Sequence, residues 1–116
     1  MSAEILELQA SLRAFASERE WDQFHSPKNL AAALSVEAAE LLEHFQWLTE
    51  DQSRSVPDDK REAIAEEVAD VFLYLLQLAD KLGIDPVQAA QKKMQANGIK
   101  YPVERAKGTS KKYSEL

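Results

Sequence analysis

The sequence predicts an all-α fold, in which a four-helix core is followed by an irregular basic tail. Apolar residues recur at spacings of three and four along four segments, which is the period of an amphipathic helix. The chain of 116 residues holds only three glycines and four prolines, and 45% of its residues are hydrophobic. We expect one domain over residues 1–116, with the tail at residues 99–116.

The first helix is predicted over residues 3–19. Its apolar positions lie three or four residues apart and share one narrow face, which comprises Ile5, Leu8, Leu12 and Phe15. The segment "EWDQFH" that follows mixes aromatic and polar side chains and is expected to be a loop.

The second helix is predicted over residues 27–48, with Ser26 as N-cap and Pro27 at the first helical position. Its apolar face comprises Leu30, Leu34, Leu41, Phe45 and Leu48. At 100° per residue Glu37 falls within this face and Glu40 lies at its edge. A buried helix face therefore carries carboxylates that require an explanation. The segment "TEDQSRSVPDD" beyond it is expected to be a polar loop.

The third helix is predicted over residues 59–82, because Asp59 and Glu62 form a capping-box pattern and Gly83 follows the last apolar residue. Its main stripe comprises Ile64, Val68, Val71, Leu75, Leu78 and Leu82. The second half of this helix is apolar on almost every side, which one small chain covers poorly. We therefore expect a homo-oligomer.

The fourth helix is predicted to begin with Asp85 as N-cap, Pro86 at the first position and Gln88 closing a capping box. It is expected to end near Asn97, before Gly98.

The distribution of charge is uneven along the chain. Residues 1–90 carry 18 acidic and 7 basic side chains, whereas residues 91–116 carry 2 acidic and 7 basic ones. An acidic body argues against a nucleic-acid partner. An acidic body beside a short basic tail favours a cation together with a small polyanion as ligands.

The composition also bears on the compartment. There is no cysteine, which removes disulfides, thiolate metal sites and a cysteine nucleophile. The start of the chain lacks a basic signal region, and the apolar run "VFLYLLQLA" is far shorter than the roughly 20 residues of a membrane span. We expect a cytoplasmic protein with no membrane partner.

Two pairs of acids at helical spacing are the candidate catalytic and metal-binding residues. Glu37 and Glu40 project from one face of the second helix, and Glu67 and Asp70 repeat the spacing on the third, with Tyr74 one turn further. Burying several facing carboxylates is costly without a positive partner. A divalent cation is the simplest partner, although E-x-x-E pairs are also common on solvated helix faces.

Carboxylate oxygens are hard ligands, which favours Mg²⁺, with Mn²⁺ as a possible substitute, over zinc or copper. Neither His25 nor His44 has a glutamate three positions before it, so the pattern of a di-iron bundle is missing. The basic tail, which includes Lys93, Lys100, Lys111 and Lys112, either closes over phosphate groups or is a disordered, solubilising segment.

The acidic motifs resemble those of a known family. "EAAE", followed at a distance by "EEVADVFLYLL", with 26 residues between Glu40 and Glu67, resembles the E-x-x-E…E-x-x-D signature of the MazG-like, all-α nucleoside triphosphate pyrophosphohydrolases. The segments "EREWDQFHSPKNLAAAL", "FQW", "KMQANGIKYPV" and "KGTSKKYSEL" resemble the dCTP pyrophosphatase branch of that family, so the resemblance spans nearly the whole chain.

The resemblance implies a four-helix core that assembles as a dimer of dimers and binds Mg²⁺. It implies that the metal is held by Glu37, Glu40, Glu67 and Asp70. It implies that the base and sugar are bound by Trp21, His25, Trp47 and Tyr74, with weaker contacts to sugar and phosphate from Asn29, Lys93, Asn97, Tyr101, Lys112 and Tyr113. His44 departs from the pattern, where an apolar residue is expected, and we interpret it as a core residue.

The leading hypothesis is a Mg²⁺-dependent nucleotide pyrophosphohydrolase. Its substrate would be dCTP or a modified cytosine deoxynucleotide, its products the monophosphate and pyrophosphate, and its role the cleaning of the nucleotide pool. Glu37 or Glu40 would orient or deprotonate the attacking water. The alternatives are a non-catalytic helical oligomerisation module and a metal-dependent hydrolase of another phosphorylated metabolite.

Overall fold

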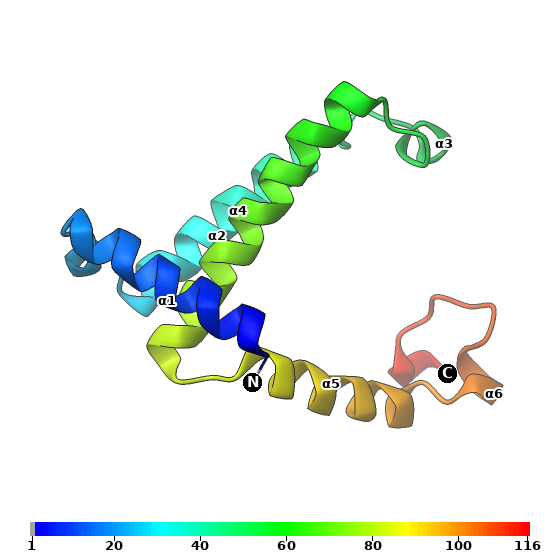
Figure 1. Ribbon diagram of the computed structural model, residues 1–116. Coiled ribbons are helices and arrows are strands. Elements are labelled where there is room, and N and C mark those ends of the chain that lie inside the picture. Colours follow the sequence, from blue (N-terminus) through cyan, green and yellow to red (C-terminus); the bar gives the residue numbers. More distant parts are fainter. Residues whose placement is uncertain (1) are drawn as a thin grey trace. The chain divides into compact units, whose positions relative to one another are not determined.

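The computed structural model describes residues 2–116, which form helices and turns without any strand, so the all-α prediction is confirmed. The elements in chain order (Figure 1) are α1 Ala3–Glu18, η1 Asp22–Phe24, α2 Pro27–Glu43, α3 Glu50–Ser53, α4 Asp58–Leu82, α5 Pro86–Lys100, α6 Val103–Ala106 and η2 Tyr113–Glu115. They divide into two compact units, an N-terminal unit of Ser2–Ile84 and a C-terminal unit of Asp85–Leu116.

The N-terminal unit is built on a hairpin of two long helices. α2 and α4 lie side by side along most of their length, and α1 crosses the second half of α4 (Figure 1). Nη1 of Arg13 donates to both carboxylate oxygens of Asp80, at 2.9 Å each, and so joins α1 to the end of α4. The site described below depends on this arrangement of three helices.

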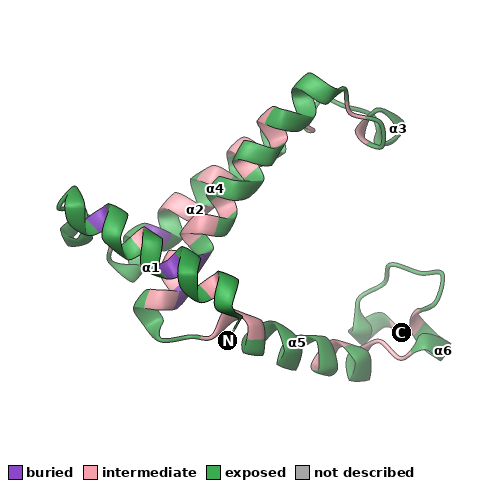
Figure 2. Ribbon diagram, viewed as in Figure 1, coloured by how far each residue is buried: buried purple, intermediate pink, exposed green. Residues whose placement is uncertain are grey.

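The buried core of the N-terminal unit is small and lies where α1, α2 and α4 meet (Figure 2). Leu30 and Leu76 are fully buried, and Ala16 and Ala79 are nearly so. The only buried polar side chain among the described residues is Gln9, whose Nε2 donates a hydrogen bond to the Leu76 carbonyl at 3.1 Å. This bond satisfies the amide that α1 brings into the core.

The apolar stripe predicted for α4 is only partly correct. The residues of α4 that are buried are Leu76 and Ala79, whereas Val68, Leu75 and Leu82 of the predicted stripe are exposed in the single chain. Because this half of α4 is apolar on almost every side, its sequence period does not select one face. The packing of α1 and α2 selects it instead, and the homo-oligomer stays a prediction.

Two helix starts agree with the prediction. The Ser26 side chain accepts a hydrogen bond from the Asn29 N–H at 3.2 Å, and the Asp85 side chain accepts from the N–H groups of Val87 and Gln88. The predicted Asp59–Glu62 box is wrong, because α4 begins at Asp58 after Pro57, which caps without a side-chain hydrogen bond.

A capping box does occur in the preceding segment, where the prediction had only a loop. Thr49 and Gln52 exchange side-chain and backbone hydrogen bonds at the start of α3. These bonds satisfy free backbone donors at the start of a helix of four residues.

Two helix ends differ from the predicted ones. The helix predicted over residues 27–48 ends at Glu43, where the backbone tightens and the Phe45 N–H bonds to the Leu42 carbonyl at 2.8 Å. Apolar spacing continues past this point, which is why periodicity alone missed the end. α5 runs through Gly98 to Lys100 rather than stopping near Asn97, because Gly98 adopts a helical conformation here.

The tail predicted from residue 99 contains two short helical segments, α6 and η2, between irregular stretches. Gly83 ends α4 in the left-handed conformation, with φ of 65°, as the sequence predicts. Among the described residues, no helix has both the length and the apolar content needed to cross a membrane.

Candidate active site

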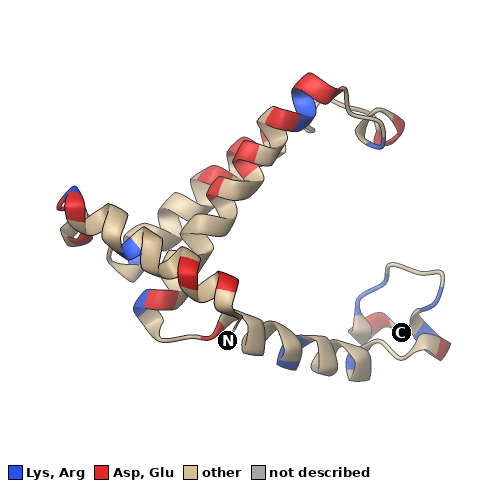
Figure 3. Ribbon diagram, in the orientation of Figure 1, with Lys and Arg blue, Asp and Glu red and all other residues tan. Residues whose placement is uncertain are grey.

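The α2–α4 hairpin brings acids from its two helices together. Glu37 of α2 and Glu67 and Asp70 of α4 each place one carboxylate oxygen within 4.8 Å of the other two. Figure 3 shows acidic residues along the first half of α4, whereas no charged residue occurs between Asp70 and Asp80. The three carboxylates, called the acid cluster below, lie where the acidic part of α4 gives way to its apolar part.

Two oxygen atoms of the acid cluster are buried without a partner. Oε2 of Glu37 and Oε2 of Glu67 are inaccessible to solvent, and neither accepts a hydrogen bond from any described residue. Buried polar atoms are nearly always hydrogen-bonded, because a lost water contact that is not replaced costs about 1–3 kcal/mol. The cluster therefore needs either protons or a cation.

The pKa of Glu37 reflects the same lack of a positive partner, since it is raised from 4.5 to about 7. The largest cause is Glu40, one turn along α2, whose carboxylate can share a hydrogen bond only with the protonated form of Glu37. Burial and the neighbouring Glu67 and Asp70 add to the effect. Glu40 thus acts on the cluster although it lies outside the compact group of three.

Among the described residues, no basic side chain forms an ion pair with these acids. The ion pairs on this unit use other acids; Arg13 pairs with Asp80, and Lys81 pairs with Asp22. Lys81 also lowers the pKa of Asp22 through its hydrogen bond and its charge. The donor set of the cluster, carboxylate oxygens alone, suits a hard divalent cation such as Mg²⁺ or Mn²⁺.

A cavity of about 430 Å³, called the aromatic cavity below, begins at the acid cluster. Asp70 and three of the predicted substrate residues, Trp21, His25 and Tyr74, line it together. The Trp21 ring meets the His25 ring edge-on, with centroids 6.5 Å apart. The structure thus brings three of the four residues predicted to bind the base and sugar, and one predicted metal ligand, to the same cavity.

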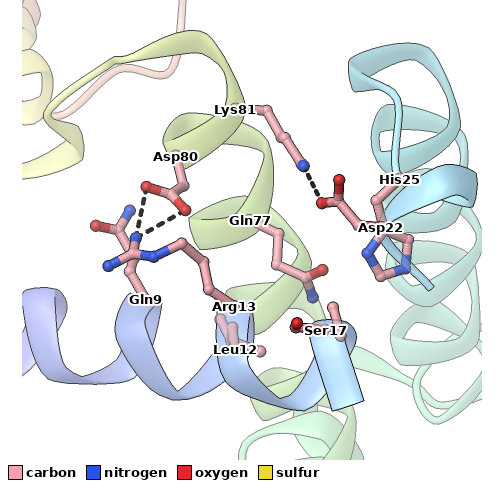
Figure 4. Close-up of a pocket in the computed structure, with 10 residues that line it drawn as sticks. Gln9, Leu12, Arg13, Ser17, Asp22, His25, Gln77, Asp80 and Lys81 are labelled. Atoms are coloured by element: carbon pink, nitrogen blue, oxygen red, sulfur yellow. Dashed lines mark hydrogen bonds and ion pairs between the residues drawn. The ribbon is translucent and has the colours of Figure 1, made fainter. Parts of the chain in front are cut away.

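A second cavity of about 320 Å³, called the ion-pair cavity, lies beside the first (Figure 4). It contains the Arg13–Asp80 pair and the Lys81–Asp22 pair. The two cavities share four lining residues, which are Leu12, Ala16, His25 and Gln77. They are therefore neighbouring parts of one recess between α1, η1 and α4.

Two predicted substrate residues of the N-terminal unit lie outside both cavities. The Asn29 side chain donates to the Phe24 carbonyl at 2.9 Å and so holds the turn before α2. Trp47 lies in the turn after α2 and is 87% exposed. His44 is half-buried and is not part of the acid cluster.

The remaining predicted substrate residues belong to the C-terminal unit, and they are Lys93, Asn97, Tyr101, Lys112 and Tyr113. Within that unit the Tyr101 and Tyr113 rings meet edge-on, with centroids 6.2 Å apart. The Lys100 ammonium lies 4.9 Å from the centroid of the Tyr113 ring. The tail therefore brings aromatic and basic side chains together.

Several residues of the aromatic cavity were not predicted from the sequence, and they are Leu8, Ser11, Leu12, Phe15, Ala16, Leu73 and Gln77. Leu8, Leu12 and Phe15 belong to the apolar face predicted for the first helix. Gln77 stands three positions after Tyr74, so its helical spacing was a usable signal.

Comparison with known proteins gives consistent matches over most of the chain. A family model described as the MazG-like family matches residues 32–116. The chain is 44% identical over 104 residues to dCTP pyrophosphatase 1 of Mus musculus, and 42% identical over 104 residues to that of Homo sapiens. Both alignments cover 88% of this chain but 61% of the relative's length, so the chain spans about three-fifths of these curated proteins.

A solved structure matches over the same share of this chain and over a larger share of its own length. The crystal structure of a pyrophosphatase from Archaeoglobus fulgidus superposes with a TM-score of 0.81 at 43% identity. The match covers 88% of this chain and 95% of that one.

Proposed function

Because the chain belongs to the MazG-like family, we propose that it is a Mg²⁺-dependent nucleoside triphosphate pyrophosphohydrolase. Its substrate is dCTP or a modified cytosine deoxynucleotide, in line with the names of the curated relatives. It releases the monophosphate and pyrophosphate, and so removes nucleotides from the cytoplasmic pool.

One observation carries this proposal: buried, unpaired carboxylate oxygens lie beside a cavity lined with aromatic rings. Glu37 and Glu67 supply the unpaired oxygens, and Asp70 belongs both to the acid cluster and to the wall of the aromatic cavity. A nucleotide has a base that stacks on aromatic rings and a polyphosphate that associates with divalent cations. The site offers a place for each part, next to one another.

The cation would be held by Glu37, Glu67 and Asp70, with Glu40 beside them. When bound, a Mg²⁺ ion supplies positive charge to the phosphate oxygens and offsets the charge that develops during the displacement. Manganese has the same preference for oxygen ligands and should substitute.

Glu37 of the acid cluster, or the neighbouring Glu40, also activates the attacking water. In the proposed reaction, water oxygen bonds to the α-phosphorus, the bond from that phosphorus to the oxygen bridging to the β-phosphorus breaks, and pyrophosphate leaves with that oxygen. Glu37 or Glu40 accepts the proton of the water.

The base of the nucleotide occupies the aromatic cavity, with Trp21, His25 and Tyr74 around it. Asn29, Trp47 and the basic and aromatic residues of the C-terminal unit remain proposed contacts to sugar and phosphate. A homo-oligomer, a dimer or a dimer of dimers, is proposed to cover the apolar side chains exposed on α2 and α4, which include Val36, Leu42, Val68, Phe72 and Leu75.

Product analysis tests this proposal. Purified protein with Mg²⁺ is incubated with a panel of canonical and modified deoxynucleoside triphosphates, and the products are separated by ion-exchange chromatography. We expect equal amounts of monophosphate and pyrophosphate, formed fastest from dCTP or a cytosine analogue, and no reaction in EDTA. Inorganic phosphate and a diphosphate as products would contradict attack at the α-phosphorus.

A second function, a non-catalytic helical assembly module, is favoured by the same exposed apolar residues. It predicts an oligomer whose thermal midpoint is insensitive to Mg²⁺ and nucleotides. The pyrophosphohydrolase predicts a midpoint that rises with both, because a ligand that binds only the native state stabilises it.

A further inference from the structure

Gln77 lies where the aromatic cavity and the ion-pair cavity meet, and it lines both. Figure 4 shows its side chain extending from α4 toward α1, between the Arg13–Asp80 pair and the Lys81–Asp22 pair. It is half-buried, so its amide is partly shielded from water.

The Gln77 amide is open, unlike the other amide of this recess. Gln9 also lines the ion-pair cavity, but its Nε2 is bonded to the Leu76 carbonyl and it is 3% exposed. Gln77 makes no side-chain hydrogen bond with any described residue, and the neighbouring charged groups are already paired with one another. One glutamine therefore serves the core, and the other presents a free donor and a free acceptor to the cavity.

Along α4, Gln77 lies beyond Tyr74 when the helix is followed from the acid cluster. Asp70, Tyr74 and Gln77 are separated by four and then three residues, so they lie on one face of the helix. At a rise of 1.5 Å per residue, Gln77 is about 10 Å from Asp70 along the axis. A group that reaches from the acid cluster past Tyr74 arrives at the Gln77 amide.

We propose that Gln77 reads the hydrogen-bonding edge of the nucleotide base and is a specificity-determining residue of this enzyme. The inference rests on the proposed function, in which the phosphates lie at the acid cluster and the base lies in the aromatic cavity. Stacking holds any base, whereas a hydrogen-bonding edge distinguishes one base from another.

The chemistry of the carboxamide defines what it recognises. Its N–H and C=O match a base edge with one acceptor beside one donor, such as N3 and the 4-amino group of cytosine. Guanine presents two adjacent donors, N1–H and the 2-amino group, and an amide held against these two groups has an acceptor for only one of them. A carboxylate in place of the amide has only acceptors, and therefore matches guanine and loses the contact with N3 of cytosine.

Two substitutions test the inference. Gln77→Leu keeps the size of the side chain and removes both hydrogen-bonding groups, and Gln77→Glu keeps the acceptor and removes the donor. Gln91→Leu is the matched control, because Gln91 is exposed on α5 and lines neither cavity. For each protein, kcat/KM is measured with dCTP, dTTP, dATP and dGTP, together with the thermal midpoint and its shift with Mg²⁺.

We expect Gln77→Leu to lower kcat/KM for the preferred nucleotide about tenfold, which corresponds to about 1.4 kcal/mol of lost interaction. The loss should appear mainly in KM, and the spread of kcat/KM over the four bases should narrow by a similar factor. Gln77→Glu should raise the ratio of dGTP to dCTP turnover about tenfold. Gln91→Leu should keep the wild-type ranking, and all variants should keep the Mg²⁺ shift.

Equal losses for all four nucleotides, or no change for any, would overturn the inference while leaving the pyrophosphohydrolase in place. If the wild-type protein cleaves none of the nucleotides, the proposed function fails. The role of Gln77 is then tested by measuring, with calorimetry, how tightly each protein binds the four deoxynucleoside monophosphates. A ranking that changes in Gln77→Glu supports its role, and a protein that binds none of them overturns it.

Discussion

The two ends of α4 treat their carboxylates in opposite ways. Near the C-terminal end, Asp80 is paired with both oxygens to Arg13 of α1 at 2.9 Å. In the first half of the helix, Glu67 has a buried oxygen without a partner and faces Glu37 and Asp70. The first arrangement is complete in the single chain, and the second needs something the chain does not supply. The acid that joins two helices is paired, whereas the acids proposed to bind a cation are left unpaired.

The largest effect should follow removal of charge from the acid cluster. We expect Glu67→Gln to lower kcat/KM at least 100-fold, because a metal site supplies several kcal/mol of charge stabilisation. Asp80→Asn, the matched change at the paired end, should leave kcat/KM within about twofold, since its carboxylate is engaged by Arg13. Steady-state kinetics with saturating Mg²⁺ measures both, and equal losses in the two variants would remove the distinction between the ends of α4.

Metal binding should stabilise the protein through the acid cluster and not through the Asp80 end of α4. At Mg²⁺ concentrations about 100 times the dissociation constant, the gain is about 2.7 kcal/mol, or roughly 10 °C in the thermal midpoint. We expect Asp80→Asn to retain this shift and Glu37→Gln to lose most of it. Calorimetric scans with and without Mg²⁺ test this, and a full shift in Glu37→Gln would contradict the assignment of that ligand.

The stability of the metal-free protein should depend on pH through Glu37. Its pKa is raised from 4.5 to about 7, so between these values the native state holds a proton that the unfolded chain has lost. Stability therefore falls as pH rises through this range, and no further loss arises above it. In urea denaturation in EDTA, the wild-type protein should lose stability relative to Glu37→Gln between pH 5 and about pH 8. A constant difference over that range would contradict the raised pKa.

The smallest effect should follow removal of the Arg13–Asp80 ion pair. Arg13 is 58% exposed, and exposed ion pairs contribute about 0.2–1 kcal/mol. We expect Arg13→Met to lower the free energy of unfolding by less than about 1 kcal/mol and to leave the Mg²⁺ shift unchanged. Chemical denaturation at low and high salt measures this, and a loss that does not shrink at high salt would mean that packing of the arginine stem, not its charge, matters.

Much of the site could be predicted from local spacing, because spacing on a helix determines which side chains share a face. Glu37 and Glu40 on one helix, and Glu67, Asp70 and Tyr74 on the other, follow directly from a period of 3.6 residues. The starts at Ser26 and Asp85 follow from local capping chemistry in the same way. The predicted capping box at Asp59 shows the limit of local spacing, because the helix begins one residue earlier, at Asp58, with Pro57 as N-cap.

Sequence patterns were enough to predict that the chain is helical, that acids stand on apolar helix faces, and that aromatic residues lie near them. Which of these groups meet depends on how the helices pack. The sequence predicted an apolar face on α1. The position of α1 across α4 creates the recess that holds both cavities, pairs Arg13 with Asp80 and leaves the Gln77 amide without a hydrogen bond to any described residue. The physical reason is that contacts between helices depend on crossing geometry and shape, which a period along one helix does not encode.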